Sequence, residues 1–435
     1  MASSLTIRQA KLVLPDRVVT GDLVVEDGII TSISPRATHP CGEVIQGAGL
    51  TVLPGLIDGH VNFRDPGWPE VETMHSGSCA AAAGGVTSFL DMPHNRPNTC
   101  DLETLHHKLQ VASENSLVNF GFYLEGTNEN IDSLLSNTPT SGVVICPTNF
   151  GVEELGDAAL ENVFASTNLP IAFVSEDPVR LRERKILYPD TREVSDHSRI
   201  FDPRTASDAM QYALALARKH GSPIHFLQVS SEEEVSLLQR HHSTLISGAI
   251  SIQHLALDAG DAYERLGSHA QTLPPLRTAR HHHALWTLLT QEHRVCLTSG
   301  HLPVSLQRKN AAYPTSESGM PAIEWWLSLC LHFVHEERMT LSDVARLCCD
   351  LPAQIHGIPR KGRLEVGFDG DLVLVDCAAQ REVHPESFQT ACGWSPWEEQ
   401  TLVGWPVMTI VRGCPVYRDG EIINGQRGRP LQFVR

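Results

Sequence analysis

The sequence predicts an α/β protein in which a (β/α)8 barrel stands beside a small β-sandwich built from both chain ends. Through the middle of the chain, short apolar segments alternate with amphipathic helical ones, as in parallel strands joined by crossover helices. Strand-like segments with Asp-Gly turns precede this region and return after it. The length of 435 residues suits a barrel of roughly 250 residues plus a smaller module.

The two ends of the chain carry the sandwich strands. "LTIRQAKLVL" and "GDLVVEDGIITSIS" come first, with Asp27 and Gly28 at a hairpin turn. Similar material returns in "GDLVLVD", "MTIVRG" and "YRDGEII". We therefore expect residues 1–52 and 360–435 to form the β-sandwich domain and residues 53–359 to form the barrel.

Eight candidate barrel strands lie between these ends. Closure of a barrel needs that number, and the active site of such a barrel lies at the C-terminal strand ends. The expected strands are residues 55–62, 86–92, 118–126, 142–149, 171–177, 223–230, 244–251 and 295–301.

Charge and composition exclude several kinds of partner. With 34 basic and 51 acidic residues the formal net charge is −17, which repels nucleic acid and anionic membranes. No segment has the roughly 18 apolar residues of a membrane helix, and the N-terminus lacks a signal-peptide pattern, so we expect a cytoplasmic protein. The eleven cysteines show no CxxC pairing and are expected to be reduced, mostly buried thiols.

Several motifs carry a resemblance to a known family. They are "PGLIDGHVNFRDPG", "AAAAGGVTSFLDMP", "GFYLEGTNENIDSL", "LPPLRTARHHHALW", "SGMPAIEWWL", "GRLEVGFDGDLVLVD" and "WSPWEEQTLVGWPVMTIVRG". Together they resemble the cyclic amidohydrolases of the amidohydrolase superfamily, dihydroorotase most closely, with allantoinase and hydantoinase as relatives. The resemblance implies a TIM barrel whose mouth holds two divalent metals, usually zinc, that activate a bridging water.

The metal ligands implied by the resemblance are mostly replaced. Active members use a His-x-His pair on strand 1, a carboxylated lysine on strand 4, histidines on strands 5 and 6, and an aspartate on strand 8. Only the first histidine is kept, so neither a bound metal nor an intact catalytic group is expected, and Gly300 stands where the aspartate belongs. The matching positions are His60, Asn62, Val144 (Cys146 if the register shifts), Val174, Gln228 and Gly300.

The substrate-binding positions are partly kept. Arg64 matches the arginine that binds the substrate carboxylate, and its forked donors suit that role. His94 replaces the asparagine that usually follows Met-Pro, with Asn95 beside it, while Leu273 and Val304 replace polar residues of the family. Arg64, His94 and Asn95 therefore form the expected remnant of the substrate site.

Other histidines and amides allow different interpretations. Consecutive helical residues point about 100° apart, so the run 281–283 is expected to be a solvated helix start rather than a metal site. We expect His225 and His254 to be hydrogen-bonded structural residues. Asn62, Gln228 and Gln253 are expected to form, in part, a hydrogen-bonded cluster in the former metal cavity.

The sequence also contains residues for two kinds of catalysis without a metal. Cys146 as a nucleophile would need a base, for which His60 or His94 across the barrel mouth are the candidates. Glu176 and Asp177 with Asp58 and His60 would give an acid–base set, but without a Lewis acid amide hydrolysis forfeits several kcal/mol of transition-state stabilisation. Asp58 is expected to be a supporting or structural carboxylate.

Three functional hypotheses follow. The favoured one is an inactive, metal-free dihydroorotase homologue that acts by binding or assembly, as a homo-oligomer or with aspartate carbamoyltransferase or an active dihydroorotase in pyrimidine synthesis. This partner rests on family analogy alone. The alternative is an active hydrolase of a cyclic amide with an atypical zinc site at His60, Asn62 and Gln228, or with no metal. The third is a sensor that binds an anionic small molecule through Arg64.

Overall fold

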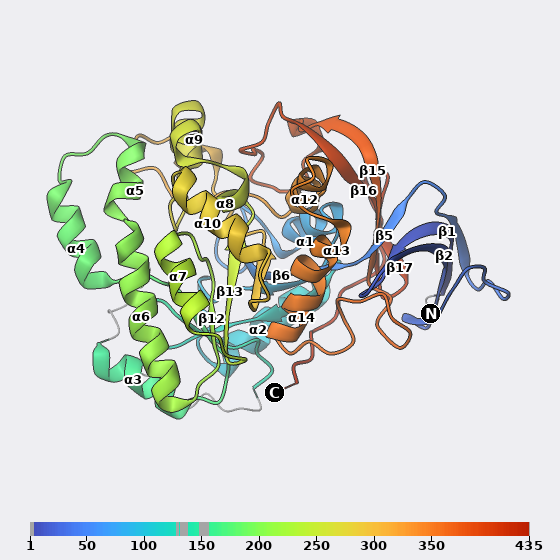
Figure 1. The fold of residues 1–435 in the computed structure, drawn as a ribbon, viewed down its shortest axis with the longest axis horizontal. Coiled ribbons are helices and arrows are strands. Elements are labelled where there is room, and N and C mark those ends of the chain that lie inside the picture. The colour runs from blue at the N-terminus through green and yellow to red at the C-terminus, as the bar shows by residue number, and fades with distance from the viewer. Residues whose placement is uncertain (1–3, 128–129, 131–137, 148–155, 435) are drawn as a thin grey trace.

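The computed structural model describes residues 4–127, 130, 138–147 and 156–434. A barrel of parallel strands occupies the centre, and helices surround it, both on the side away from the flanking sheet and between the barrel and that sheet (Figure 1). The barrel strands are β6 (Leu56–Val61), β7 (Val86–Asp91), β8 (Asn119–Phe122), β9 (Leu124–Glu125), β10 (Val143–Ile145), β11 (Ile171–Phe173), β12 (Ile224–Phe226), β13 (Ile246–Ser251) and β14 (Val295–Thr298).

Each barrel strand falls within a range that the sequence predicts, because short apolar runs between polar turns identify buried parallel strands. β8 and β9 are two parts of the third predicted strand, interrupted at Tyr123. A parallel bridge between Val61 and His301 joins β6 to the end of β14. Residues 148 and 149 of the fourth predicted strand lie outside the described residues.

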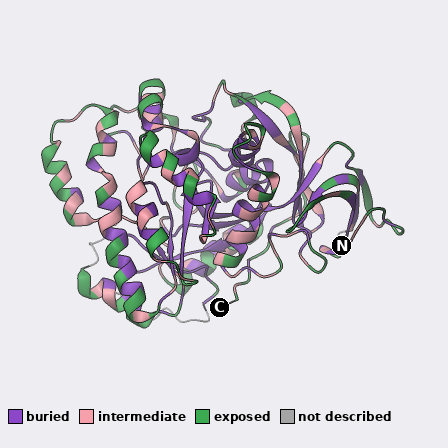
Figure 2. Ribbon diagram, in the orientation of Figure 1, coloured by how far each residue is buried: buried purple, intermediate pink, exposed green. Residues whose placement is uncertain are grey.

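Helices follow the strands and cover the barrel, with their buried faces turned inward (Figure 2). Side-chain caps begin several of them, as where the Asp202 side chain accepts from the Thr205 backbone N–H. The helices are α1 (Met74–Ala83), α2 (Leu102–Asn115), α3 (Asp157–Ser166), α4 (Pro178–Leu187), α5 (His197–Ile200), α6 (Pro203–His220), α7 (Glu232–Arg240), α8 (Gln253–Ala256), α9 (Ala259–Leu266), α10 (Ala279–Leu289), α11 (Leu306–Lys309), α12 (Trp326–His335), α13 (Leu341–Ala345) and α14 (Leu351–Ile355).

Both chain ends form the flanking β domain. β5 pairs with β1 on one side and with β15 on the other, so the N-terminal and C-terminal strands belong to one hydrogen-bonded sheet around its own apolar core. Its strands are β1 (Leu5–Val13), β2 (Val18–Glu26), β3 (Ile29–Ser34), β4 (Glu43–Gln46), β5 (Thr51–Pro54), β15 (Leu372–Glu382), β16 (Thr401–Val411), β17 (Cys414–Arg418) and β18 (Glu421–Ile422).

The last residues of the chain return to the barrel. Pro430 forms a parallel bridge with Phe120 of β8, and Leu431 and Phe433 pack among the apolar residues inside the barrel. The C-terminus accordingly lies below the barrel in Figure 1, away from the flanking sheet. Residues 430–433 thus connect the flanking domain to β8 and to the apolar cluster inside the barrel.

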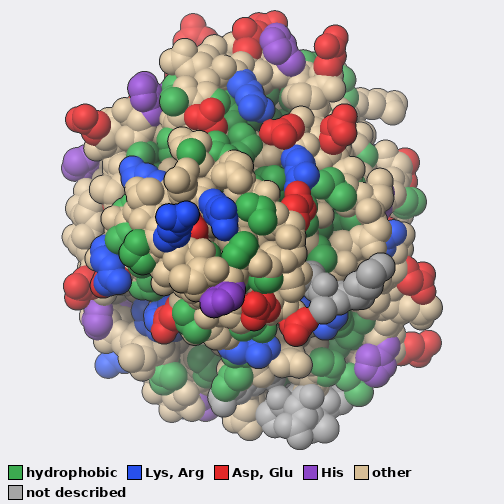
Figure 3. Space-filling view, turned by 90° about the vertical axis from the view of Figure 1, so that its right-hand side faces the viewer, with side chains coloured by type: hydrophobic (Ala, Val, Ile, Leu, Met, Phe, Trp, Pro, Cys, Tyr) green, Lys and Arg blue, Asp and Glu red, His purple; other side chains and the backbone are tan. Residues whose placement is uncertain are grey.

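The charged surface, the helices and the cysteines bear on the expectations from composition. On the flanking-domain face shown in Figure 3, basic and acidic side chains are interspersed. Among the helices described here, none has the length and apolar character needed to cross a membrane. All eleven cysteines are unpaired, and most are buried, in agreement with the expected reduced thiols.

Candidate functional site

A cavity of about 400 Å³ opens at the C-terminal ends of the barrel strands. This is the end at which the fold places active sites, because loops after every strand converge there. His60, Asn62, Arg64, His94 and Asn95 all line it. The structure therefore brings together side chains that the sequence analysis assigned to the site from two different strands.

His60 lies one residue before the end of β6 and lines the cavity. Burial lowers its pKa from 6.5 to about 4, so the imidazole is neutral at pH 7. Its Nδ1 atom is buried and has no hydrogen-bond partner among the described residues. Asn62 donates from Nδ2 to the His301 carbonyl oxygen at 3.4 Å. Strand 1 thus presents one imidazole and one amide.

Asp58 has a structural role. Its side chain is fully buried, and Oδ1 accepts from the Thr298 hydroxyl and, at 3.2 Å, from the Ser299 backbone N–H. These contacts hold β6 against β14 and close the barrel. The structure therefore agrees with the expected supporting role of this carboxylate.

Gly300 leaves no room for a side chain. Its φ of +59° lies in the left-handed region, and a Cβ atom there would lie 2.7 Å from Gln253 Nε2 and 3.1 Å from Gln228 Nε2. The amides of these two glutamines therefore surround the position at which the resemblance implies an aspartate.

The prediction that Asn62, Gln228 and Gln253 form a hydrogen-bonded cluster is wrong for the described residues. Asn62 and Gln253 donate to carbonyl oxygens of the segment after β14, and Gln253 does so to Gly300 at 3.5 Å. Among the described residues, no hydrogen bond joins two of the Asn62, Gln228 and Gln253 side chains. The amides lie close to these carbonyls, so they bond to the backbone instead of to one another.

The strand 4 and strand 5 positions are apolar. Val144 is fully buried in β10 and belongs to the apolar cluster inside the barrel that also contains Ala172 and Leu227. Val174 packs against the same cluster and lines the cavity. Valine has no donor or acceptor in its side chain, so these two positions offer only van der Waals contact, although Glu176 and Gln228 bring polar groups to the same side of the cavity.

Arg64 lines the cavity together with Arg96 and Arg308. Nε donates to the Pro303 carbonyl oxygen at 3.0 Å, and the guanidinium carbon lies 5.7 Å from the Trp68 ring centroid. Nη2 lies 3.5 Å from Glu317 Oε1, while Arg308 Nη1 lies 3.1 Å from the other Glu317 oxygen. One carboxylate therefore lies between two guanidinium groups at the cavity.

His94 and Asn95 lie beside a buried ion pair. Burial, with repulsion from His60, lowers the pKa of His94 to about 4. Asn95 accepts at Oδ1 from Lys108 Nζ at 2.5 Å, and the same ammonium lies 2.7 Å from Asp91 Oδ2. Lys108 and Asp91 are both fully buried, so this pair sets the position of the loop after β7.

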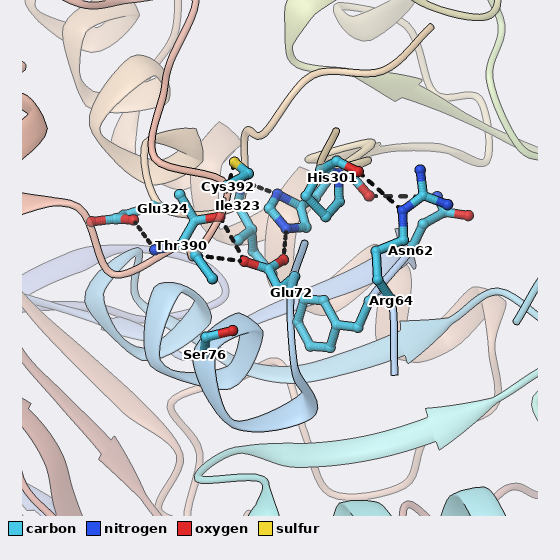
Figure 4. Close-up of polar contacts among 12 residues, drawn as sticks. Asn62, Arg64, Glu72, Ser76, His301, Ile323, Glu324, Thr390 and Cys392 are labelled. Carbon is cyan, nitrogen blue, oxygen red and sulfur yellow. Dashed lines mark hydrogen bonds and ion pairs between the residues drawn. The ribbon is translucent and has the colours of Figure 1, made fainter. Parts of the chain in front are cut away.

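A second buried network supports the segment after β14. Figure 4 shows Glu72 between His301 and Thr390. His301 Nδ1 accepts from the Ala322 backbone N–H, so Nε2 carries the proton and donates to Glu72 at 2.5 Å. Burial raises the pKa of the neighbouring Glu324 to about 8. These contacts join the barrel to residues 389–391 of the C-terminal region.

The other histidines named in the sequence analysis make contacts that support the fold. His225 is hydrogen-bonded to Ser247 at 3.0 Å, and His254 donates from Nε2 to the Pro274 carbonyl oxygen at 3.1 Å, as expected. The expectation of a solvated run at 281–283 is wrong for its first member. His281 is buried and accepts at Nδ1 from the Glu232 backbone N–H of α7, because α10 packs on α7 there.

The structure does not bring together the residues that either kind of metal-free catalysis would need. Cys146 is buried and is not among the residues that line the cavity, whereas His60 and His94 are. Glu176 lines the cavity, whereas Asp177 caps α4 by accepting from the Arg180 N–H at 2.8 Å. Asp58 is engaged with β14, so the proposed acid–base set is dispersed.

The chain is similar in sequence to proteins of one known family. A sequence model of the amidohydrolase family matches residues 51–416. The chain belongs to the amidohydrolase family. It is 30% identical to a dihydroorotase of Methanothermobacter thermautotrophicus over 417 residues, covering 94% of each chain. It is also 30% identical to an allantoinase of Desulfitobacterium hafniense over 441 residues, covering 98% of each chain.

Solved structures agree with the fold. The L-hydantoinase (dihydropyrimidinase) from Arthrobacter aurescens superposes with a TM-score of 0.92 at 25% identity, covering 99% of this chain and 100% of that one. The relatives share the barrel with a flanking β domain, as the sequence predicts. Membership of this family of cyclic amide hydrolases is thus established from both sequence and fold.

The zinc pair implied by the family does not fit the residues present. Zinc in such sites needs imidazole or carboxylate donors, and of the six positions that the resemblance alone matches to the family's ligands only His60 supplies one. Asn62 and Gln228 are neutral amides, and Val144 is apolar. Within the described ranges, no group of three or more His, Cys, Asp or Glu side chains could hold a metal ion.

Some site residues were missed from the sequence. Glu317 lies in an irregular loop, where no periodicity predicts the direction of its side chain. Lys108 could have been found, because it lies on the same face of α2 as the buried Leu105 and Ala112, an unusual place for an unpaired lysine.

Proposed function

We propose that this chain is a metal-free member of the amidohydrolase family that does not hydrolyse cyclic amides and acts by binding. The cavity persists, with Arg64 in its wall, while the groups that would activate water are replaced. Binding needs only shape and hydrogen-bond partners, whereas hydrolysis at a neutral amide also needs an activated nucleophile.

Gly300 is the observation that carries the proposal. In the family this position supplies both a metal ligand and the general base. Here the backbone has a φ of +59°, and the Gln253 amide and Ser251 Cβ each lie 2.7 Å from where a Cβ would stand. The left-handed backbone and the close Ser251 Cβ atom both favour glycine here, which supports the proposal that this position has no catalytic aspartate.

The biological setting is part of the same proposal. By analogy with non-catalytic dihydroorotase homologues, we assign the chain a cytoplasmic role in pyrimidine synthesis, as a homo-oligomer that associates with aspartate carbamoyltransferase or with an active dihydroorotase. Co-elution of the two purified proteins in size-exclusion chromatography supports the association with the transcarbamoylase, and separate elution at micromolar concentrations contradicts it.

Hydrolysis assays test the catalytic part of the proposal. Dihydroorotate, allantoin and hydantoin are each incubated with the protein, with and without added zinc, beside His60→Ala as the matched variant. We expect the two proteins to give the same rate as buffer. Turnover that requires His60 contradicts the proposal and supports the alternative, an amide hydrolase with an atypical site.

A further inference from the structure

Glu317 places its own carboxylate between two arginines of the cavity. Its two carboxylate oxygens face different arginines, Oε1 at 3.5 Å from Arg64 Nη2 and Oε2 at 3.1 Å from Arg308 Nη1. All three residues line the cavity. The side chain of Glu317 is 36% exposed, so solvent reaches this pairing and weakens it.

Arg64 does not depend on Glu317 for its position. Its Nε donates to the Pro303 carbonyl oxygen at 3.0 Å, and its guanidinium lies against Trp68. The side chain is only 14% exposed. The guanidinium therefore stays oriented if the carboxylate leaves, which lowers the entropic cost of binding a second anion.

The backbone of Glu317 is fixed while its side chain is not. The buried ammonium of Lys309 donates to the carbonyl oxygens of Glu317 at 3.0 Å, Gly319 at 2.7 Å and Gln271 at 2.6 Å. Gln271 also donates from Nε2 to the Ser316 carbonyl oxygen at 3.1 Å. The carboxylate can thus leave the arginines by rotation about its own side-chain bonds, without movement of the loop.

We propose that Glu317 is an internal counter-ion that competes with an anionic ligand for Arg64 and Arg308. The inference rests on the proposed binding function. A ligand with a single carboxylate beside a small amide-containing ring replaces the Glu317 carboxylate and pairs with both guanidinium groups. A neutral ring of the same size gains nothing from this exchange, because it brings no charge to the arginines.

The competition makes Glu317 a specificity residue. While the carboxylate remains, the charge of Arg64 is partly neutralised, and an anionic ligand must displace a charge already present. Removing that charge strengthens the attraction for anions and leaves neutral ligands unaffected. The difference between two matched ligands therefore isolates the role of Glu317.

The test measures the affinities of two ligands by isothermal titration calorimetry at low ionic strength. L-dihydroorotate carries a carboxylate, and 5,6-dihydrouracil is the same ring without it. We expect Glu317→Gln to bind L-dihydroorotate about tenfold more tightly than the unchanged protein, with the affinity for 5,6-dihydrouracil unchanged. Glu365→Gln, at an exposed position outside the cavity, is the matched charge control and leaves both affinities unchanged.

Different outcomes separate the two proposals. Equal affinity of Glu317→Gln and the unchanged protein for L-dihydroorotate overturns the counter-ion inference, as does a failure of Glu317→Gln to bind this ligand. An equal gain for both ligands also overturns it, because charge would then not be the cause. Hydrolysis of either ligand during titration contradicts the proposed function instead. Glu317→Ala repeats the comparison if the glutamine variant has a lowered melting temperature.

Discussion

Two sides of the same cavity differ in chemistry. On the β6, β7 and β14 side, buried charged groups keep their partners, as in the pairs Asp91–Lys108 and Glu72–His301. On the β10 to β12 side, Val144, Val174 and Leu227 belong to one apolar cluster, of which Val174 and Leu227 line the cavity beside Glu176 and Gln228. Groups that hold the barrel together are present, while positions that would bind metal are apolar or amide. The buried charges that support the barrel are thus paired, and removing one partner of such a pair would be strongly destabilising.

Removing one partner of a buried ion pair on the charged side is expected to change the free energy of unfolding most. Lys108→Met leaves Asp91 without its cation in a fully buried position and is expected to lower the free energy of unfolding by about 3–5 kcal/mol. Urea denaturation measures the change. Adding Asp91→Asn to this variant recovers part of the loss. Lys219→Met, on an exposed pair, is the control, and an equally small effect at both lysines would contradict the assigned role.

The buried His60 imidazole, on β6, predicts that the stability of the protein depends on pH. The His60 pKa of about 4 lies below the ordinary 6.5, so the unfolded state binds more protons between these values. Stability is therefore expected to fall as the pH drops from 6.5 toward 4, with His60 contributing a slope of up to about 1.4 kcal/mol per pH unit. His60→Gln reduces the slope measured by urea denaturation, whereas exposed His283→Gln does not. An unchanged slope in His60→Gln would show that His60 is not held neutral.

The apolar side gives a smaller effect. Val144→Ala removes two buried methyl groups from the cluster inside the barrel and is expected to lower the free energy of unfolding by about 2 kcal/mol. Val179→Ala on exposed α4 serves as the control and changes stability by less than about 0.5 kcal/mol. If Val144→Ala is as mild as its control, the β10 position is not a packed part of the core.

The sequence was sufficient for the barrel strands and for the cavity positions on them. Strand identity follows from apolar runs, and a position at a strand end fixes where a side chain such as His60 or Arg64 must lie. The contacts of individual side chains could not be predicted from the sequence. His281 is buried because α10 packs on α7, and Gln253 bonds to the β14 segment, both of which are tertiary contacts. Glu317 reaches Arg64 across 253 residues of chain, which no local pattern predicts.

The zinc content of the purified protein tests the central claim most directly. Protein prepared without chelator or His-tag is incubated with excess zinc, freed of unbound ion and analysed by plasma mass spectrometry. The altered donor set predicts less than about a tenth of an equivalent of bound zinc. A value of about one or two equivalents would contradict the account, because it would require a metal site that His60 and its amide and valine neighbours cannot form.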